Sequence, residues 1–168
     1  MSSRALKDLQ APLKQQYRDN PSSAVVTLRA SGRLDAPGVS CRVETGRALV
    51  EAGLHPATGG TGLQACSGDM LLEALAACAG VTLRAVATAL DIPVRGGSVD
   101  VEGDLDFRGT LGVSKEAPVG FREIRLKLNL DSDATREQLD TLLKLTERYC
   151  VVLQTLKSAP PVLARVES

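Results

Sequence analysis

Aromatic residues are nearly absent from this 168-residue chain, which has two Phe, two Tyr and no Trp. A hydrophobic core therefore has to be built from Leu, Val, Ile and Ala. That is feasible because the hydrophobic share is 43%, which is normal for a soluble globular protein. A net charge is also absent, since 20 basic residues balance 20 acidic ones. The balance gives no general attraction to nucleic acid or to an anionic membrane, so we expect neither as a partner.

Metal-binding signatures are missing as well. The chain has one histidine, His55, and its four cysteines include no Cys-x-x-Cys pair. A structural zinc site needs four nitrogen or sulfur ligands at close spacing, so we expect no metal and no other cofactor. The segment 55–62 holds a proline and three glycines, which predicts a surface loop and makes His55 a loop residue rather than a catalytic base.

Signals for secretion or membrane insertion are not found in the sequence. The first residues are polar and lack the apolar segment of a signal peptide. A membrane-spanning helix needs about 18 or more apolar residues with few charges, and residues 70–90 come closest but are interrupted by Glu73 and Arg84. We therefore expect a cytoplasmic protein, in which thiols are mostly reduced.

The length fits a single domain covering residues 1–168. Residues 1–20 carry leucines at helical spacing and predict an N-terminal helical segment. Alternation of apolar and polar residues predicts six strands, at residues 24–34, 39–46, 47–52, 99–107, 124–130 and 162–166. The first three read as an antiparallel meander, and the next two are expected to pair because their polar faces carry complementary charges.

Two helical regions separate these groups of strands. The first begins at Ser67-Gly-Asp69-Met and is apolar on nearly every side from residue 70 to residue 90, which predicts a helix buried on most faces. The second follows a cap predicted at Asp131-Ser-Asp133 and continues into a further helical turn at residues 149–156. Strands, helix, strands, helix and strand in this order predict an α+β domain with segregated sheets.

Two cysteines lie within these helical regions and are the most informative residues of the chain. Cys78 stands in the apolar helix and Cys150 in the second helical region. If the two thiols meet in the fold, they allow redox chemistry; if they do not, they are two small buried apolar residues. Cys41 and Cys66 are interpreted as structural.

The segment Ser67-Gly-Asp-Met-Leu-Leu-Glu-Ala-Leu-Ala-Ala-Cys78 resembles the signature helix of the OsmC/Ohr family, and Glu147-Arg-Tyr-Cys150-Val-Val stands where that family has its second cysteine. The resemblance implies an OsmC-like fold, with antiparallel sheets wrapped around long buried central helices of an intertwined homodimer. It also implies a thiol-dependent peroxidase that reduces organic hydroperoxides in oxidative-stress defence. Cys78 would be the peroxidatic residue, Cys150 the resolving residue, and an external dithiol the reductant.

Family peroxidases also use an Arg from an early strand and a Glu ten residues before the first cysteine. Arg29 and Arg33 are both candidates for the cation, while the Glu position is Gly68 and the nearest carboxylate is Asp69. The proline that follows the second cysteine in the family is replaced by Val151. These departures leave an alternative open, a non-catalytic OsmC-like module that binds a small hydrophobic ligand in the dimer cleft.

Overall fold

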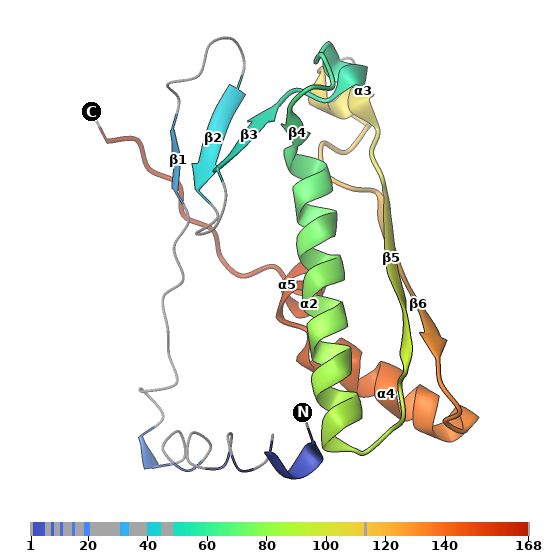
Figure 1. Ribbon diagram of the computed structural model, residues 1–168. Helices are drawn as coiled ribbons and strands as arrows, with labels where there is room; N and C mark the ends of the chain where they lie inside the picture. The colour runs from blue at the N-terminus through green and yellow to red at the C-terminus, as the bar shows by residue number, and fades with distance from the viewer. Residues whose placement is uncertain are drawn as a thin grey trace. The chain divides into compact units, whose positions relative to one another are not determined.

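Figure 1 shows a computed structural model of the chain. The described residues are 2–5, 8, 11, 15, 19, 20, 31–33, 40–44, 49–112 and 114–167, with the backbone alone described at 31–33 and 40–44. They belong to two compact units: the first comprises Met1–Lys7, Ala74–Asp100 and Lys127–Ser168, and the second comprises Asp8–Glu73 and Val101–Leu126. A single domain over residues 1–168 stays a prediction. Within the N-terminal segment, the described residues 3–5, 8, 11, 15 and 19 are helical.

A four-stranded sheet belongs to the second unit. It consists of β1 (Ser31–Arg33), β2 (Ser40–Glu44), β3 (Leu49–Gly53) and β4 (Ala65–Cys66), in that order. The pairs β1–β2 and β2–β3 are antiparallel, which confirms the predicted meander in its described part, whereas β4 joins β3 in parallel. The loop between β3 and β4 contains one 3-10 turn, η2 (Pro56–Thr58), which His55 caps by accepting a hydrogen bond from the Ala57 N–H.

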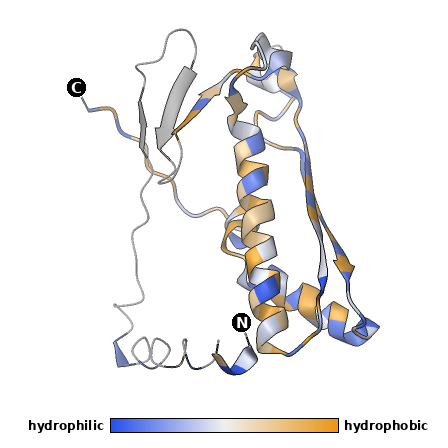
Figure 2. Ribbon diagram, viewed as in Figure 1, coloured by the Kyte–Doolittle hydropathy of each residue, from blue (hydrophilic) through white to orange (hydrophobic). Residues whose placement is uncertain are grey.

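The long helix α2 (Ser67–Ala89) begins where the sequence predicts it. Figure 2 shows that it is apolar along most of its length. Only one stripe is buried in this chain, however, formed by residues four apart: Leu75, Ala79, Leu83 and Ala87. Val81, on another face, is 72% exposed. By length and composition alone α2 is able to cross a membrane. The core helix of a soluble protein meets the same criterion, so the absence of a membrane span stays a prediction.

Strands β5 (Gly96–Asp104) and β6 (Glu123–Asp131) form the second sheet, as predicted. The Arg95 N–H donates to the Asp131 carbonyl at one end and the Arg122 N–H to the Asp104 carbonyl at the other, so the strands run antiparallel. The prediction that the first strand reaches Phe107 is wrong. The Asp106 carboxylate accepts a hydrogen bond from the Arg108 N–H and starts the short helix α3 (Phe107–Thr110) instead.

Two helices follow: α4 (Arg136–Tyr149) and α5 (Val151–Lys157). The cap predicted at Asp131-Ser-Asp133 is wrong, because the carboxylates of Asp131 and Asp133 bind the guanidinium of Arg95. Thr135 caps α4 instead. Its hydroxyl accepts from the Gln138 N–H, while the Gln138 side chain accepts from the Thr135 N–H, which is a capping box.

The core of the first unit lies where α2, α4 and the β5–β6 ribbon meet. Leu83, Ala87, Ile92 and Leu142 are buried together there, with Leu128 and Leu130 of β6 packed against them. The strand predicted at residues 162–166 is wrong, since residues 159–167 have no regular secondary structure. Val162, Leu163 and Val166 are almost fully exposed. Alternation alone does not make a strand when no edge is there to accept its hydrogen bonds.

Candidate functional site

Cys78 lies in the middle of α2, beside the stripe that α2 buries. Its side chain is partly exposed, whereas the neighbouring Leu75 and Ala79 are completely buried. The apolar, Ala-rich sequence keeps α2 regular through this region, because Ala and Leu are the strongest helix formers. A partly exposed thiol on a rigid helix is accessible to a small reactant and is also held in a fixed direction.

Cys150 lies at the junction of α4 and α5 and is completely buried. Its backbone is extended, with φ −72° and ψ 107°, so the chain changes direction at this residue. The Cys150 N–H still donates to the Thr146 carbonyl of α4 at 2.9 Å, and the Cys150 carbonyl accepts from the Gln154 N–H of α5 at 2.9 Å. Cys150 is therefore fixed by one helix on each side.

The fold brings Cys78 and Cys150 into contact, and both belong to the first unit. Burial is the largest influence on the Cys78 pKa and raises it. Four hydrogen-bonding interactions oppose burial and together lower the pKa of Cys78 below its ordinary value; the donors are the Val152 N–H, the Cys150 side chain, the Val151 N–H and the Thr82 hydroxyl. Donors around a sulfur stabilise its thiolate.

Cys150 responds in the opposite direction. Burial is again the largest influence and raises the pKa of Cys150, and the adjacent Cys78 sulfur raises it further through hydrogen bonding and charge. The N–H groups of Leu153 and Val152 lower it, but not enough to reverse the shift. The pair is therefore polarised, with Cys78 favoured as the thiolate and Cys150 as the protonated thiol. Both are free thiols in this structure.

The other predicted site residues are not brought to this pair by the described part of the chain. Arg29 lies outside the described residues, and Arg33 is described only as a backbone position of β1. Asp69 is in the first turn of α2, where a carboxylate favours the helix dipole. Among the described residues, no charged side chain shifts the pKa of Cys78.

Thr82, Val151 and Val152 are site groups that the sequence analysis missed. Thr82 was accessible by spacing, because it is four residues after Cys78 on the same helix face. The two valines act through their backbone N–H groups, so their side chains carry no signal. Their position was the available signal, since the first N–H groups of a helix have no partner within it.

A shallow hollow borders the junction on α5. It has a volume of about 480 Å³ and is lined mainly by apolar surface from α4, α5 and the segment that follows: Arg148, Tyr149, Val151, Gln154, Thr155, Ser158 and Pro160. The Arg148 guanidinium lies over the Tyr149 ring, 5.6 Å from its centroid. Val151, the first residue of α5, is 70% exposed in this hollow.

Comparison with solved structures supports one fold. An OsmC-like protein from Mycoplasma pneumoniae is 18% identical, with a TM-score of 0.66, over 80% of this chain and 89% of that one. An organic hydroperoxide resistance protein OsmC from Legionella pneumophila is also 18% identical, with a TM-score of 0.62, over 80% and 92%. An organic hydroperoxide resistance protein from Elizabethkingia anophelis is 17% identical, with a TM-score of 0.63, over 81% and 91%. At these identities the likeness concerns the fold.

Sequence comparison assigns the family. Among curated proteins no significant match was found. The family model described as OsmC-like protein matches residues 60–164, a range that begins before α2 and ends after α5. It therefore includes both cysteines, the whole β5–β6 ribbon and most of the first unit, and the fold it implies is the α+β architecture described above. The chain belongs to the OsmC-like family.

Proposed function

We propose that the protein is a thiol-dependent peroxidase that reduces organic hydroperoxides in oxidative-stress defence, with Cys78 as the peroxidatic residue and Cys150 as the resolving one. The observation that carries the proposal is the polarised thiol pair. A peroxidatic cysteine has to be a thiolate that the reactant can reach, and Cys78 combines partial exposure with a lowered pKa. A resolving cysteine has to lie within reach of it, as Cys150 does.

The reaction follows from this arrangement. The Cys78 thiolate attacks the terminal oxygen of the hydroperoxide, an S–O bond forms, and the O–O bond breaks. The alkoxide leaves as an alcohol after taking a proton from the Cys150 thiol. Cys78 is now a sulfenic acid, and the Cys150 thiolate attacks its sulfur; an S–S bond forms and hydroxide leaves as water with a proton from solvent. An external dithiol then reduces the disulfide by two exchange steps.

The comparisons support an organic substrate. Two of the solved structures with this fold are organic hydroperoxide resistance proteins. The hollow beside Cys150 adds apolar surface, including Val151 and Tyr149, against which the organic part of a hydroperoxide can pack. Arg29 and Arg33 remain our two candidates for a cation at the site, and Asp69 remains the candidate carboxylate.

Peroxide consumption by single-cysteine variants tests the proposal. Reduced protein is mixed with cumene hydroperoxide and dithiothreitol, and residual peroxide is followed over time. We expect Cys78→Ser to abolish turnover and Cys150→Ser to stop after one equivalent, with a sulfenic acid that dimedone traps on Cys78. Cys66→Ser is the matched control, because this half-buried free thiol at the end of β4 has no role in the scheme. Full turnover by Cys78→Ser would rule the mechanism out.

A second candidate is the non-catalytic ligand-binding module. A cavity of about 400 Å³ in the second unit favours it, because its lining contains both phenylalanines of the chain, Phe107 and Phe121, together with Leu54 and Leu105. His55 stacks on Phe107 with ring centroids 4.9 Å apart. If ligand binding were the whole function, Cys78→Ser would leave peroxide survival of the host cell unchanged, whereas the peroxidase proposal requires a loss.

We also propose a cytoplasmic homodimer. Apolar residues outside the buried stripe of α2, such as Val81, and the apolar side chains of the C-terminal segment are exposed in the single chain, and a second copy would cover them. Light scattering after gel filtration measures the mass directly. A monomer at micromolar concentration would contradict the dimer without affecting the thiol chemistry.

A further inference from the structure

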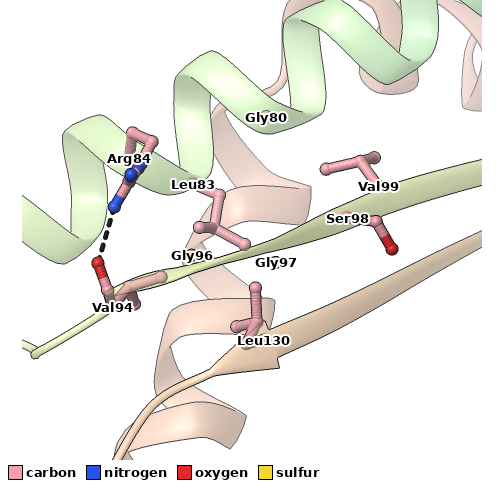
Figure 3. Close-up of a pocket in the computed structure, with 9 residues that line it drawn as sticks. All are labelled: Gly80, Leu83, Arg84, Val94, Gly96, Gly97, Ser98, Val99 and Leu130. Atoms are coloured by element: carbon pink, nitrogen blue, oxygen red, sulfur yellow. Dashed lines mark hydrogen bonds between the residues drawn. The ribbon is translucent and has the colours of Figure 1, made fainter.

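A second cavity lies between α2 and the start of β5, within the first unit (Figure 3). Glycines stand where larger residues would close it. Gly80 faces Val99, and a Cβ added at Gly80 would come within 3.6 Å of a Val99 methyl group. A Cβ added at Gly96 would have no atom within 4 Å. The helix and strand therefore stay apart here, and the space between them is about 260 Å³, room for roughly nine water-sized atoms.

The walls of this cavity are apolar. Leu83 of α2 and Leu130 of β6 point into it, and Val94 and Val99 line its ends (Figure 3). Leu83, Val94 and Leu130 also belong to the core of the first unit, so the cavity is an opening into that core. Ser98 borders the cavity, but its hydroxyl is engaged with the side chains of Asp100 and Asn129. An apolar cavity of this kind stays dry or takes an apolar molecule.

One charged side chain stands at the rim. The Arg84 guanidinium donates to the Val94 carbonyl at 2.6 Å, which holds it at the mouth of the cavity (Figure 3). Arg84 makes no ion pair with any carboxylate in the described part of the chain. A guanidinium has five N–H donors, so the bond to Val94 leaves donors for a second acceptor. A carboxylate suits this planar fork best.

We propose that this cavity binds a small amphipathic carboxylate of medium chain length, with its alkyl chain between Leu83, Val99 and Leu130 and its carboxylate on Arg84. The apolar walls match an alkyl chain, and the single unpaired cation matches one negative charge. A polyphosphate or a sugar would leave most of its polar groups unpaired against these walls.

The site is separate from the thiol pair. Gly80 and Arg84 are two and six residues after Cys78 on α2. At 3.6 residues per turn both positions lie on the side of the helix away from Cys78. Thr82, which does act on Cys78, projects on the Cys78 side. The proposed ligand is therefore not the peroxidase substrate in its reacting position, and its binding is measurable without any turnover.

Titration of the full-length protein with sodium octanoate, followed by ¹H–¹⁵N NMR, tests the proposal. We expect saturable shifts at Gly80, Arg84, Gly96 and Gly97, with a Kd below about 1 mM. Arg84→Gln should weaken octanoate binding about tenfold while leaving the weaker binding of 1-octanol unchanged, since only the charge contact is lost. Arg84→Lys should recover part of the affinity. Arg165→Gln, the loss of one charge in the exposed C-terminal segment, is the matched control and should bind like the wild type.

Gly80→Leu provides an independent test, because leucine favours the helix and its side chain would fill the cavity. It should abolish binding of both octanoate and octanol while far-UV circular dichroism stays the same. Failure of octanoate to shift the cavity amides at 5 mM, equal octanoate affinity in Arg84→Gln and wild type, or shifts confined to other parts of the chain would each overturn the proposal. The peroxidase proposal would stand in all three cases.

Discussion

The thiol of Cys150 interacts directly with the sulfur of Cys78, and the contact moves the two groups apart in acidity. Desolvation raises the pKa of both, but the surrounding donors reverse that shift for Cys78 and leave it in place for Cys150. A pair of chemically identical side chains therefore acquires two roles from its surroundings. The roles come from the two N–H groups at the start of α5 and the Thr82 hydroxyl, all directed at one sulfur.

Alkylation should distinguish the two thiols by pH. Because its pKa is lowered, Cys78 is a thiolate over a pH range in which Cys150 is still protonated, so iodoacetamide should modify Cys78 first as the pH is raised from 5 to 9. Peptide mass spectrometry of the reduced protein measures both modification rates. Cys66, half-buried outside the pair, gives the internal reference. Equal pH profiles for Cys78 and Cys150 would contradict the polarised pair.

Val151→Pro should raise the pKa of Cys78. Proline is well tolerated at the first position of a helix, and the extended backbone of Cys150 suits a residue that precedes proline. The fold should therefore be kept while one N–H donor to the Cys78 sulfur is removed. The thiolate fraction at neutral pH falls, and peroxide reduction slows. Val151→Ala, which keeps the N–H, is the control and should keep the wild-type pH profile.

Thr146→Val should increase the free energy of unfolding by about 1 kcal/mol. The Thr146 side chain is completely buried, and its hydroxyl has no hydrogen-bond partner in the described part of the chain. Valine has nearly the same shape and removes the unsatisfied group. Thr146→Ser keeps the hydroxyl and loses a methyl group, so it should destabilise by roughly 1 kcal/mol. Urea denaturation measures both, and a less stable Thr146→Val protein would indicate that the hydroxyl has a partner.

Thr135→Ala should lower the free energy of unfolding by about 1 kcal/mol. The substitution removes the hydroxyl that accepts from the Gln138 N–H and breaks the capping box at the start of α4. Thr135→Ser preserves the oxygen and should be close to the wild type. Because α4 ends at Cys150, fraying from its far end should leave the alkylation rate of Cys78 nearly unchanged, which thermal denaturation and alkylation together can check.

Local pattern predicted most of the elements in this chain but not all of their ends. The β5–β6 pair and the start of α2 follow from alternation and from Ser67-Gly-Asp69, and the structure confirms both. Phe107 has the residue type and spacing of a strand, yet the Asp106 carboxylate captures the next N–H groups and starts α3. Side-chain competition of this kind is decided by geometry that periodicity does not contain.

Long-range partners were the main limit. Asp131 and Asp133 precede α4 in the way caps do, but Arg95 is 36 residues before Asp131 and takes both carboxylates. Residues 162–166 alternate well and still form no strand, because hydrogen bonds to a neighbour define a strand. Cys78 and Cys150 were paired by family resemblance, and no spacing between them predicts that they touch.

The position of Cys150 between two helices has a mechanical consequence. A bond from Cys78 to this junction would close a loop of roughly 70 residues, which by chain entropy stabilises the folded state by about 4 kcal/mol. Oxidation would then clamp α2 to the junction of α4 and α5, and reduction would release it. The resting state of the enzyme would be its softer form, and heat resistance would record how recently the protein had met an oxidant.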